Sequence, residues 1–439
     1  MKKWILFLLL LCLFNCKEEK NDCYLTSEKA LQYFKSVEAI CVRDNGKLWG
    51  KNLYGPLMFV DRPSRKIFAN QPDNAGLLKK KEGVYTGFYP KELLLNATPV
   101  EFGGITYALT PLPVDEVPYN INIAAIHSLF HRFQKFKGIA SHGYITNNMD
   151  ERDARLWLKL EWKALRKAIN SKGDERNLFI RDALIFREAN RELYSKYADD
   201  ANRFENYEGL TTFTYTLLCT YSYEELKTRL FEILDKVYSM RSYSESYGFI
   251  HGALYASLLY DSGFDFKNIQ TDTFDLGNAV KEAYKIELPE ICRDVAGSLA
   301  VNYNIDIINQ EEEQRISDIS KRLHTQTNIF TERPVVFIEL ISPSFGFEPE
   351  DIQPLDTLGT LYKSIRVADN WGKLVVNDGS GCLVSNNYKS LRITAKGYKE
   401  EKNQIRGEGW ELTLNWDEWE FVQVGQNYLV RKKIRNLLY

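Results

Sequence analysis

The chain has 439 residues, of which 44% are hydrophobic and 13% aromatic, so it is long and apolar enough for two or three domains with substantial cores. This composition excludes a chain that is disordered throughout its length. The formal net charge is −2, and nothing in this balance indicates a nucleic-acid partner.

Residues 1–16 have the organisation of a bacterial export signal. A positive start precedes an apolar run over residues 4–14, which is shorter than the roughly 20 residues of a membrane-spanning helix. The Leu-Phe-Asn-Cys sequence at 13–16 resembles a bacterial lipoprotein signal, which implies that Cys16 is lipidated and becomes the new N-terminus. An ordinary signal peptide, cleaved near Cys16 or Cys23, is the alternative.

The residues after Cys16 bear on the location of the mature chain. Residues 17–19 are Lys-Glu-Glu, which is similar to the charged signals that send some Gram-negative lipoproteins to the cell surface. The resemblance implies a cell-envelope protein that is held on the outer membrane by its lipid, with surface exposure as a further expectation.

The remaining cysteines are scattered along the chain. Five of them follow Cys16 without a Cys-x-x-Cys pair, a pattern that favours neither a disulfide scaffold nor a zinc knuckle. Cys219 lies in an apolar segment and is expected to be a buried free thiol.

Residues 17–120 are predicted to form a β-rich region. After a short helix at 27–34, runs rich in β-branched and aromatic residues alternate with Gly and Pro, as strands and turns do. The expected strands are 57–60, 84–88 and 105–109. Pro111, Pro113 and Pro118 predict a loop before the next helix.

The segment 122–134 is the centre of the prediction. Its apolar residues suit a largely buried helix, and it places His127 and His131 four residues apart. Side chains at i and i+4 lie one above the other on a helical face, so both imidazoles can converge on one point. That geometry is typical of two histidine ligands of zinc.

Residues 121–330 follow a helical period. One predicted helix covers 154–168, and its apolar stripe includes Glu161, a carboxylate that is costly to bury unless it is paired or bound to a metal. An ion pair with Arg155 or Arg187 and a role at a metal site are both open for this residue. The further predicted helices are 179–194, 202–219, 223–238, 247–260 and 311–324.

In residues 334–439 the apolar residues recur at every second position. This period predicts a small antiparallel sheet or sandwich. The region holds Trp371, Trp410, Trp416 and Trp419. These rings either pack in the core of the sheet or form a surface for a glycan or protein. The expected strands are 335–340, 372–376, 381–384, 391–394, 410–414, 419–424 and 428–431.

A catalytic zinc site takes three protein ligands and leaves a fourth position open. Glu208 stands at the start of an apolar helix and is followed by Gly209. Together with the His-x-x-x-His helix, this motif resembles the gluzincin metallopeptidases of the glycyl-aminopeptidase type. The resemblance implies that His127, His131 and Glu208 are zinc ligands. It also implies an α+β fold in which a gluzincin-like, mainly helical central domain is flanked by β-rich N-terminal and C-terminal regions.

The chain departs from this family at Ser128, where the family has the glutamate that acts as general base. A serine hydroxyl is a poor base near neutral pH, and general base catalysis contributes about 10²- to 10⁴-fold to rate. Glu205 and Glu161 are candidates for a relocated base. The spacing from His131 to Glu208 is also longer than is usual in the family, which implies an inserted pair of helices.

Other residues are candidates by analogy with the family. Gluzincins often use a tyrosine to stabilise the developing oxyanion, and Tyr247 and Tyr255 lie at a suitable distance downstream. His251 is followed by a small Gly-Ala pair that permits close helix packing, so His251 and Glu161 are candidates for positions behind the metal ligands. The alternative for all of them is a structural role.

Three hypotheses follow. The first is an exported lipoprotein with a degenerate metallopeptidase domain, a pseudoenzyme that holds zinc and binds a peptide or protein with weak or no hydrolysis. The second is an active zinc peptidase with a relocated base. The third is a surface-binding or scaffold lipoprotein without metal, whose C-terminal tryptophans form the functional surface.

Overall fold

The computed structural model describes residues 24–90, 93, 95–114, 118–139, 144–347, 352–377, 379–401 and 404–433. The chain has an α+β fold with strand-rich regions, which confirms the predicted fold class. It divides into two compact units, residues 1–312 and 313–439. The predicted boundary between residues 120 and 121 lies inside the first unit. No helix among the described residues is long and apolar enough to cross a membrane.

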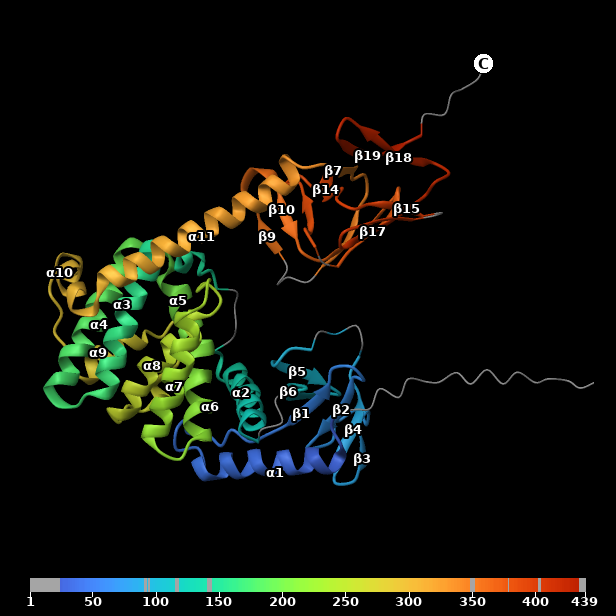
Figure 1. The fold of residues 1–439 in the computed structure, drawn as a ribbon. Coiled ribbons are helices and arrows are strands. Elements are labelled where there is room, and N and C mark those ends of the chain that lie inside the picture. The colour runs from blue at the N-terminus through green and yellow to red at the C-terminus, as the bar shows by residue number, and fades with distance from the viewer. Residues whose placement is uncertain are drawn as a thin grey trace, which may run out of the picture. The chain divides into compact units, whose positions relative to one another are not determined.

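The first unit begins with a long helix and a mixed sheet (Figure 1). Helix α1 (Ser27–Asp44) starts at the residue predicted and runs ten residues further than expected. The sheet has the strand order β3-β4-β2-β1-β6-β5, and the β1–β6 pair is parallel. Its strands are β1 (Leu57–Asp61), β2 (Lys66–Ala69), β3 (Lys79–Lys81), β4 (Val84–Phe88), β5 (Pro99–Phe102) and β6 (Ile105–Leu112).

The two faces of this sheet contact different clusters because side chains alternate along a strand. Leu57 and Phe59 belong to the main hydrophobic core that also contains the helices of this unit. Met58 and Val60 belong to a second cluster formed by the sheet itself. Phe34 of α1 stacks on Phe59 with ring centroids 4.9 Å apart. The predicted β-rich region and helical region therefore share one core.

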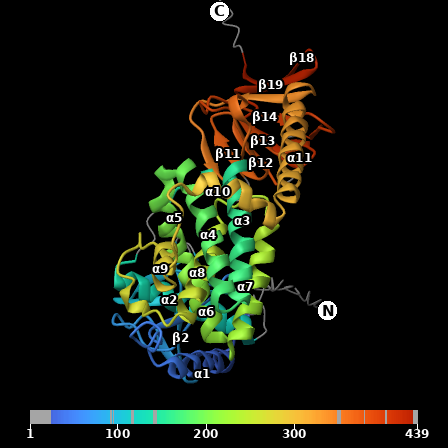
Figure 2. The same cartoon turned by 90° about the vertical axis from the view of Figure 1, so that its left-hand side faces the viewer.

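Helices make up the rest of the first unit. Helix α2 begins at Pro118 and packs against β6 and against α6, while α3 packs along α4 and contacts α8 (Figure 2). The helices are α2 (Pro118–Lys137), α3 (Arg152–Asn170), α4 (Gly173–Leu193), α5 (Ala198–Phe204), α6 (Leu210–Cys219), α7 (Tyr223–Tyr238), α8 (Tyr247–Asp261), α9 (Leu276–Ala283) and α10 (Cys292–Leu299).

The helix predicted over 202–219 is not continuous. A π-helical turn, η3 (Glu205–Gly209), separates α5 from α6. Close packing against α8 accompanies this turn, since a Cβ atom on Gly209 would lie 2.6 Å from the Cα atom of Gly252. Turns of this kind often occur at functional sites. The sequence pattern of apolar residues continues through the turn, so it gave no sign of the interruption.

The second unit contains most of α11 (Ile305–Thr331), which starts six residues before the predicted helix, and two sheets. The sheet orders are β18-β19-β7-β14-β13-β10-β9 and β15-β16-β17-β12-β11-β8. The strands are β7 (Val335–Glu339), β8 (Ser344–Gly346), β9 (Ile352–Pro354), β10 (Thr360–Tyr362), β11 (Ile365–Asp369), β12 (Gly372–Val376), β13 (Cys382–Val384), β14 (Ser390–Thr394), β15 (Lys399–Glu401), β16 (Gln404–Gly407), β17 (Trp410–Leu414), β18 (Trp419–Val424) and β19 (Asn427–Lys432).

The tryptophans of the second unit pack inside it. Trp371, Trp410 and Trp419 are buried, and Trp416 is partly buried against the same cluster. All strands predicted for this region are present, and their pairs are antiparallel except for β19 and β7, which pair in parallel and depart from the predicted antiparallel sheet or sandwich. For Trp371, Trp410 and Trp419 the structure therefore shows core packing, the first of the two roles considered for these rings.

Candidate metal centre

Three side chains converge where α2 faces the π turn. The potential ligand atoms of His127, His131 and Glu208 all lie within 4.8 Å of one another. His131 Nε2 is 3.5 Å from Glu208 Oε2. Two imidazoles and one carboxylate form a donor set suited to zinc. The structure therefore brings together the three residues that the sequence predicted as ligands, and their geometry can hold a metal ion.

The two histidines come from successive turns of α2. Their ring centroids are 4.4 Å apart and their planes are nearly perpendicular, at 83°. Burial, together with the neighbouring His131, lowers the pKa of His127 to about 3. His127 is thus neutral at physiological pH. The lone pair of a neutral imidazole is what a metal requires.

Gln134 determines which nitrogen of His131 faces the carboxylate. The Gln134 amide nitrogen donates to the carbonyl oxygens of Asn206 and Tyr207, each at 3.0 Å. The amide oxygen therefore points at His131, and Nδ1–H donates to it over 2.8 Å. With the proton on Nδ1, the lone pair of His131 lies on Nε2, on the side of Glu208. A histidine ligand is commonly held in this way by a partner on its other nitrogen.

Glu208 has an incomplete set of contacts. Its Oε2 atom is buried and has no hydrogen-bond partner among the described residues. A buried carboxylate oxygen without a partner is costly, and a bound cation removes that cost. The Tyr207 ring stacks on His131 with centroids 4.3 Å apart and so covers one side of this ligand.

Ser128 faces away from the carboxylate toward the sheet. It is fully buried, and its hydroxyl lies 2.9 Å from the carbonyl oxygen of Leu109 on β6 and accepts from the Thr110 hydroxyl at 3.0 Å. These contacts attach α2 to β6. The side chain that replaces the family's general base is therefore part of the packing between a helix and a strand.

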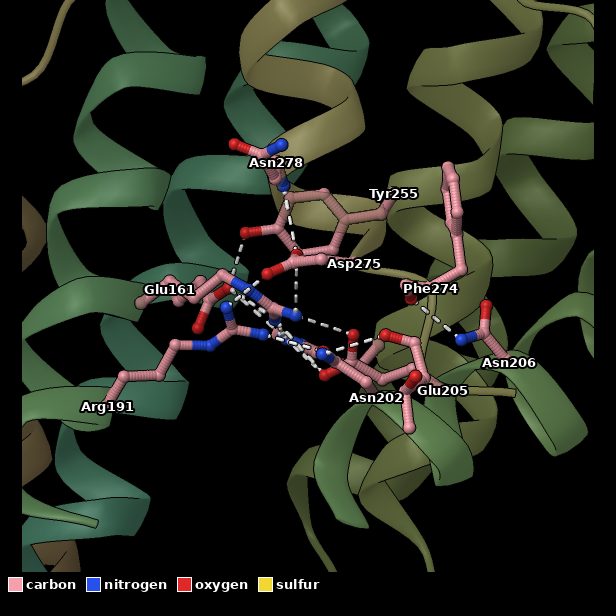
Figure 3. A network of polar contacts seen from close by, with 12 residues as sticks. Glu161, Arg191, Asn202, Glu205, Asn206, Tyr255, Phe274, Asp275 and Asn278 are labelled. Atoms are coloured by element: carbon pink, nitrogen blue, oxygen red, sulfur yellow. Dashed lines mark hydrogen bonds and ion pairs between the residues drawn. The ribbon is translucent and has the colours of Figure 1, made fainter. Parts of the chain in front are cut away.

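Glu161, Glu205 and Tyr255 belong instead to a second network of polar contacts (Figure 3). Arg187 Nη1 and Nη2 donate to the two carboxylate oxygens of Glu205 at 3.1 and 2.7 Å. The Tyr255 hydroxyl donates to Glu161, whose Oε1 is 3.6 Å from Arg187 Nη1. His251 Nε2 is 3.2 Å from the same Glu161 oxygen. Of the roles considered for Glu161, the structure shows the ion pair with Arg187.

Tyr247 lies beside this second cluster. It is fully buried, and burial followed by the nearby charge of Glu205 raises the pKa of its hydroxyl. Among the described contacts, none joins Glu161, Glu205, Tyr247, Tyr255 or His251 to the three potential metal ligands. Glu161, Glu205, Tyr255 and His251 form a separate buried network with Arg187, and the Tyr247 hydroxyl has no hydrogen-bond partner among the described residues. His142 lies outside the described residues.

Sequence reasoning did not identify two residues of the metal centre. Gln134 follows His131 by three positions, so both lie on one face of α2, and this spacing could have indicated the contact. Tyr207 immediately precedes Glu208 and lies in the π turn. Its stacking on His131 could not be predicted from the spacing of a regular α-helix. Tyr144 is a second tyrosine near the site, and burial and the charge of Glu208 raise the pKa of its hydroxyl.

Comparisons of the chain with protein-family models, with curated proteins and with solved structures gave no match.

Proposed function

We propose that the chain is an exported, lipid-anchored protein that binds one zinc ion through His127, His131 and Glu208. The observation that carries the metal site is the convergence of three donor atoms within 4.8 Å, one of which is a buried carboxylate oxygen without a hydrogen-bond partner. Two imidazoles and a carboxylate are one of the ligand sets of catalytic zinc, which leave a fourth position for water or substrate. There it would act as a Lewis acid toward a bound carbonyl group.

We further propose that the site is a degenerate gluzincin that binds a peptide or protein and hydrolyses it weakly or not at all. The order of elements along the chain supports this proposal. A sheet comes first, the His-x-x-x-His helix packs on its strand β6, and a later turn carries the third potential ligand. Ser128 also supports it. This residue stands where the family has its general base, and its hydroxyl bonds the carbonyl oxygen of Leu109, so no carboxylate is present at that position.

The alternative of an active peptidase with a relocated base is less well supported. Both carboxylate oxygens of Glu205 accept hydrogen bonds from Arg187, so the side chain is held in the network around Arg187. Glu161 is held by Tyr255 and Arg187. Neither carboxylate contacts the potential ligands, so a base role would require the network around Arg187 to break.

The location is proposed from the sequence alone. The signal at residues 1–16 and the cysteine that follows it support lipidation of Cys16 and attachment to the outer membrane, with surface exposure suggested by residues 17–19. These residues lie outside the described part of the chain. Metabolic labelling with a radioactive fatty acid would test lipidation, and a Cys16→Ala variant should lose the label.

Metal content is the experiment that tests the function. We would measure it by native and elemental mass spectrometry on the chain lacking residues 1–16, after loading with zinc and separately with iron(II). One zinc ion per chain is expected. The double variant His127→Ala, His131→Ala should contain none, whereas His324→Ala, which changes an exposed histidine, should bind as the unaltered chain does. No bound metal after loading would overturn the proposal.

A further inference from the structure

Two carbonyl groups of the π turn that carries Glu208 accept hydrogen bonds from a side chain of another helix. In a π turn the regular i to i−4 hydrogen bonds are disrupted, and such turns are rare and frequently lie at functional sites. Here the carbonyl oxygens of Asn206 and Tyr207 accept hydrogen bonds from the side chain of Gln134 on α2. One side chain thus binds two consecutive carbonyl groups next to the third potential metal ligand.

The same side chain also contacts the second potential ligand. Gln134 Oε1 accepts the Nδ1–H of His131, and Gln134 itself has no exposed surface. A buried amide is costly unless its donors and acceptor are paired, and in Gln134 both amide hydrogens and the oxygen have partners. The side chain is therefore held in one orientation by two groups from the π turn and one from its own helix α2.

We propose that Gln134 is the positioning residue of the metal centre. It orients His131 so that Nε2 faces the metal, and it holds the π turn so that Glu208 lies opposite. This inference rests on the proposed zinc site. Among the residue types of similar size, only an amide can accept from an imidazole and donate to two carbonyl groups at once. A glutamate side chain at this position would keep only the hydrogen bond from His131, and a methionine side chain would keep none of the three hydrogen bonds.

Other contacts hold the π turn from its far side, so loss of Gln134 does not by itself remove the turn. Asn206 Nδ2 donates to the carbonyl oxygens of Asp272 and Phe274 at 2.9 and 2.7 Å (Figure 3). The ion pair between Arg187 and Glu205 holds the first residue of the turn. The specific contribution of Gln134 is therefore the link between the turn and His131.

The test compares Gln134→Glu and Gln134→Met with the unaltered chain. The control is Thr214→Val on the adjacent helix α6, which removes a buried hydroxyl that bonds Leu210 and Trp49 and does not contact the three ligands. Zinc affinity is measured by competition with a chelator. The tautomer of His131 is measured in the metal-free protein from the ¹⁵N shifts of its ring, and the unfolding midpoint of each metal-free variant is measured alongside.

Gln134→Glu should keep the proton of His131 on Nδ1 and weaken zinc binding about tenfold, because the Asn206 carbonyl loses its donor from Gln134 and the Tyr207 carbonyl keeps only Thr211 as a side-chain donor. Gln134→Met should shift the tautomer population toward protonated Nε2 and weaken zinc binding about 100-fold. Thr214→Val should lower the unfolding midpoint without changing the tautomer or the zinc affinity. A purely structural role for Gln134 would not change the tautomer.

Two negative results can be told apart. If the unaltered chain binds zinc and Gln134→Met binds it equally well with an unchanged tautomer, the role of Gln134 is refuted and the zinc site stands. If the unaltered chain binds no zinc, the proposed function falls, and the positioning role falls with it. If zinc affinity fell by the same factor in Gln134→Met and in Thr214→Val, the inference would also be refuted.

Discussion

His131 Nε2 and Glu208 Oε2 face each other across 3.5 Å, and the glutamate oxygen has no hydrogen-bond partner among the described residues. One residue comes from a regular helix and the other from a π turn, so a cation between them would connect two elements. Ligands that bind only the folded state raise its stability by mass action.

Zinc is therefore expected to stabilise the folded chain, by about 2.7 kcal/mol when free zinc is 100 times its dissociation constant. Glu208→Gln should abolish this gain, because a neutral amide is a weak zinc ligand. The measurement is thermal unfolding with and without zinc. Glu232→Gln, on the exposed face of α7, is the control and should keep the full shift. An equal shift in Glu208→Gln would exclude this residue as a ligand.

Ser128→Ala should reduce stability without affecting the metal. The change removes the donor to the Leu109 carbonyl and the acceptor for Thr110, and a lost buried hydrogen bond costs about 1–3 kcal/mol. Denaturant unfolding and zinc competition on the same sample would measure both properties. A variant as stable as the unaltered chain, or one that loses zinc, would contradict the structural role of this hydroxyl.

Arg187→Met should destabilise the chain by about 3–5 kcal/mol, because Glu161 and Glu205 would remain buried without their cation. Arg187→Lys should cost less, since it keeps the charge and loses only the paired geometry. Urea unfolding of both variants would measure the difference. If Arg187→Met were as stable as Arg187→Lys, the ionic network would not be important for folding.

Acid should weaken the contact that Asp275 makes with two arginines. Burial alone would raise the pKa of this carboxyl group, but Arg187 and Arg191 lower it to about 2. A carboxyl group with a lowered pKa stabilises the fold above its unfolded pKa of about 3.9, and this contribution is lost as the pH falls through about 2. The loss should amount to about 2 kcal/mol between these values.

Asp275→Asn tests this expectation because asparagine can still accept from the backbone N–H of Asn278 at the start of α9. Its stability should change less with pH than that of the unaltered chain between about pH 4 and 2. Chemical unfolding at several pH values would show it. Asp318→Asn on α11 is the control. Parallel pH profiles for the unaltered chain and Asp275→Asn would contradict the assignment.

The thiols should be unreactive in the folded chain. Burial raises the pKa of Cys41 and of Cys219 to about 12, and burial also raises the pKa of Cys292 and Cys382. Thiolates are the reactive form, so a chain lacking residues 1–23 should resist a disulfide reagent at pH 8. After unfolding, all four cysteines should react. Fast reaction of the folded protein would show that solvent reaches these thiols.

The prediction that Cys219 is a buried free thiol is confirmed.

The sequence by itself determined the features that depend on local geometry. The four-residue spacing of His127 and His131 fixes their relative position on any α-helix, so their convergence could be predicted from the chain alone. The change of period near residue 334 predicted the strands of the second unit in the same way. The absence of a carboxylate at Ser128 is likewise a property of the sequence.

The tertiary structure alone decided which distant residues meet. Glu205 and Glu208 are three residues apart, yet one is paired with Arg187 and the other faces the histidines, because the π turn directs them to different neighbours. The burial of the tryptophans and the contact of Gln134 with the turn were decided there too. Such contacts depend on how whole elements pack, and no local period encodes the packing partner.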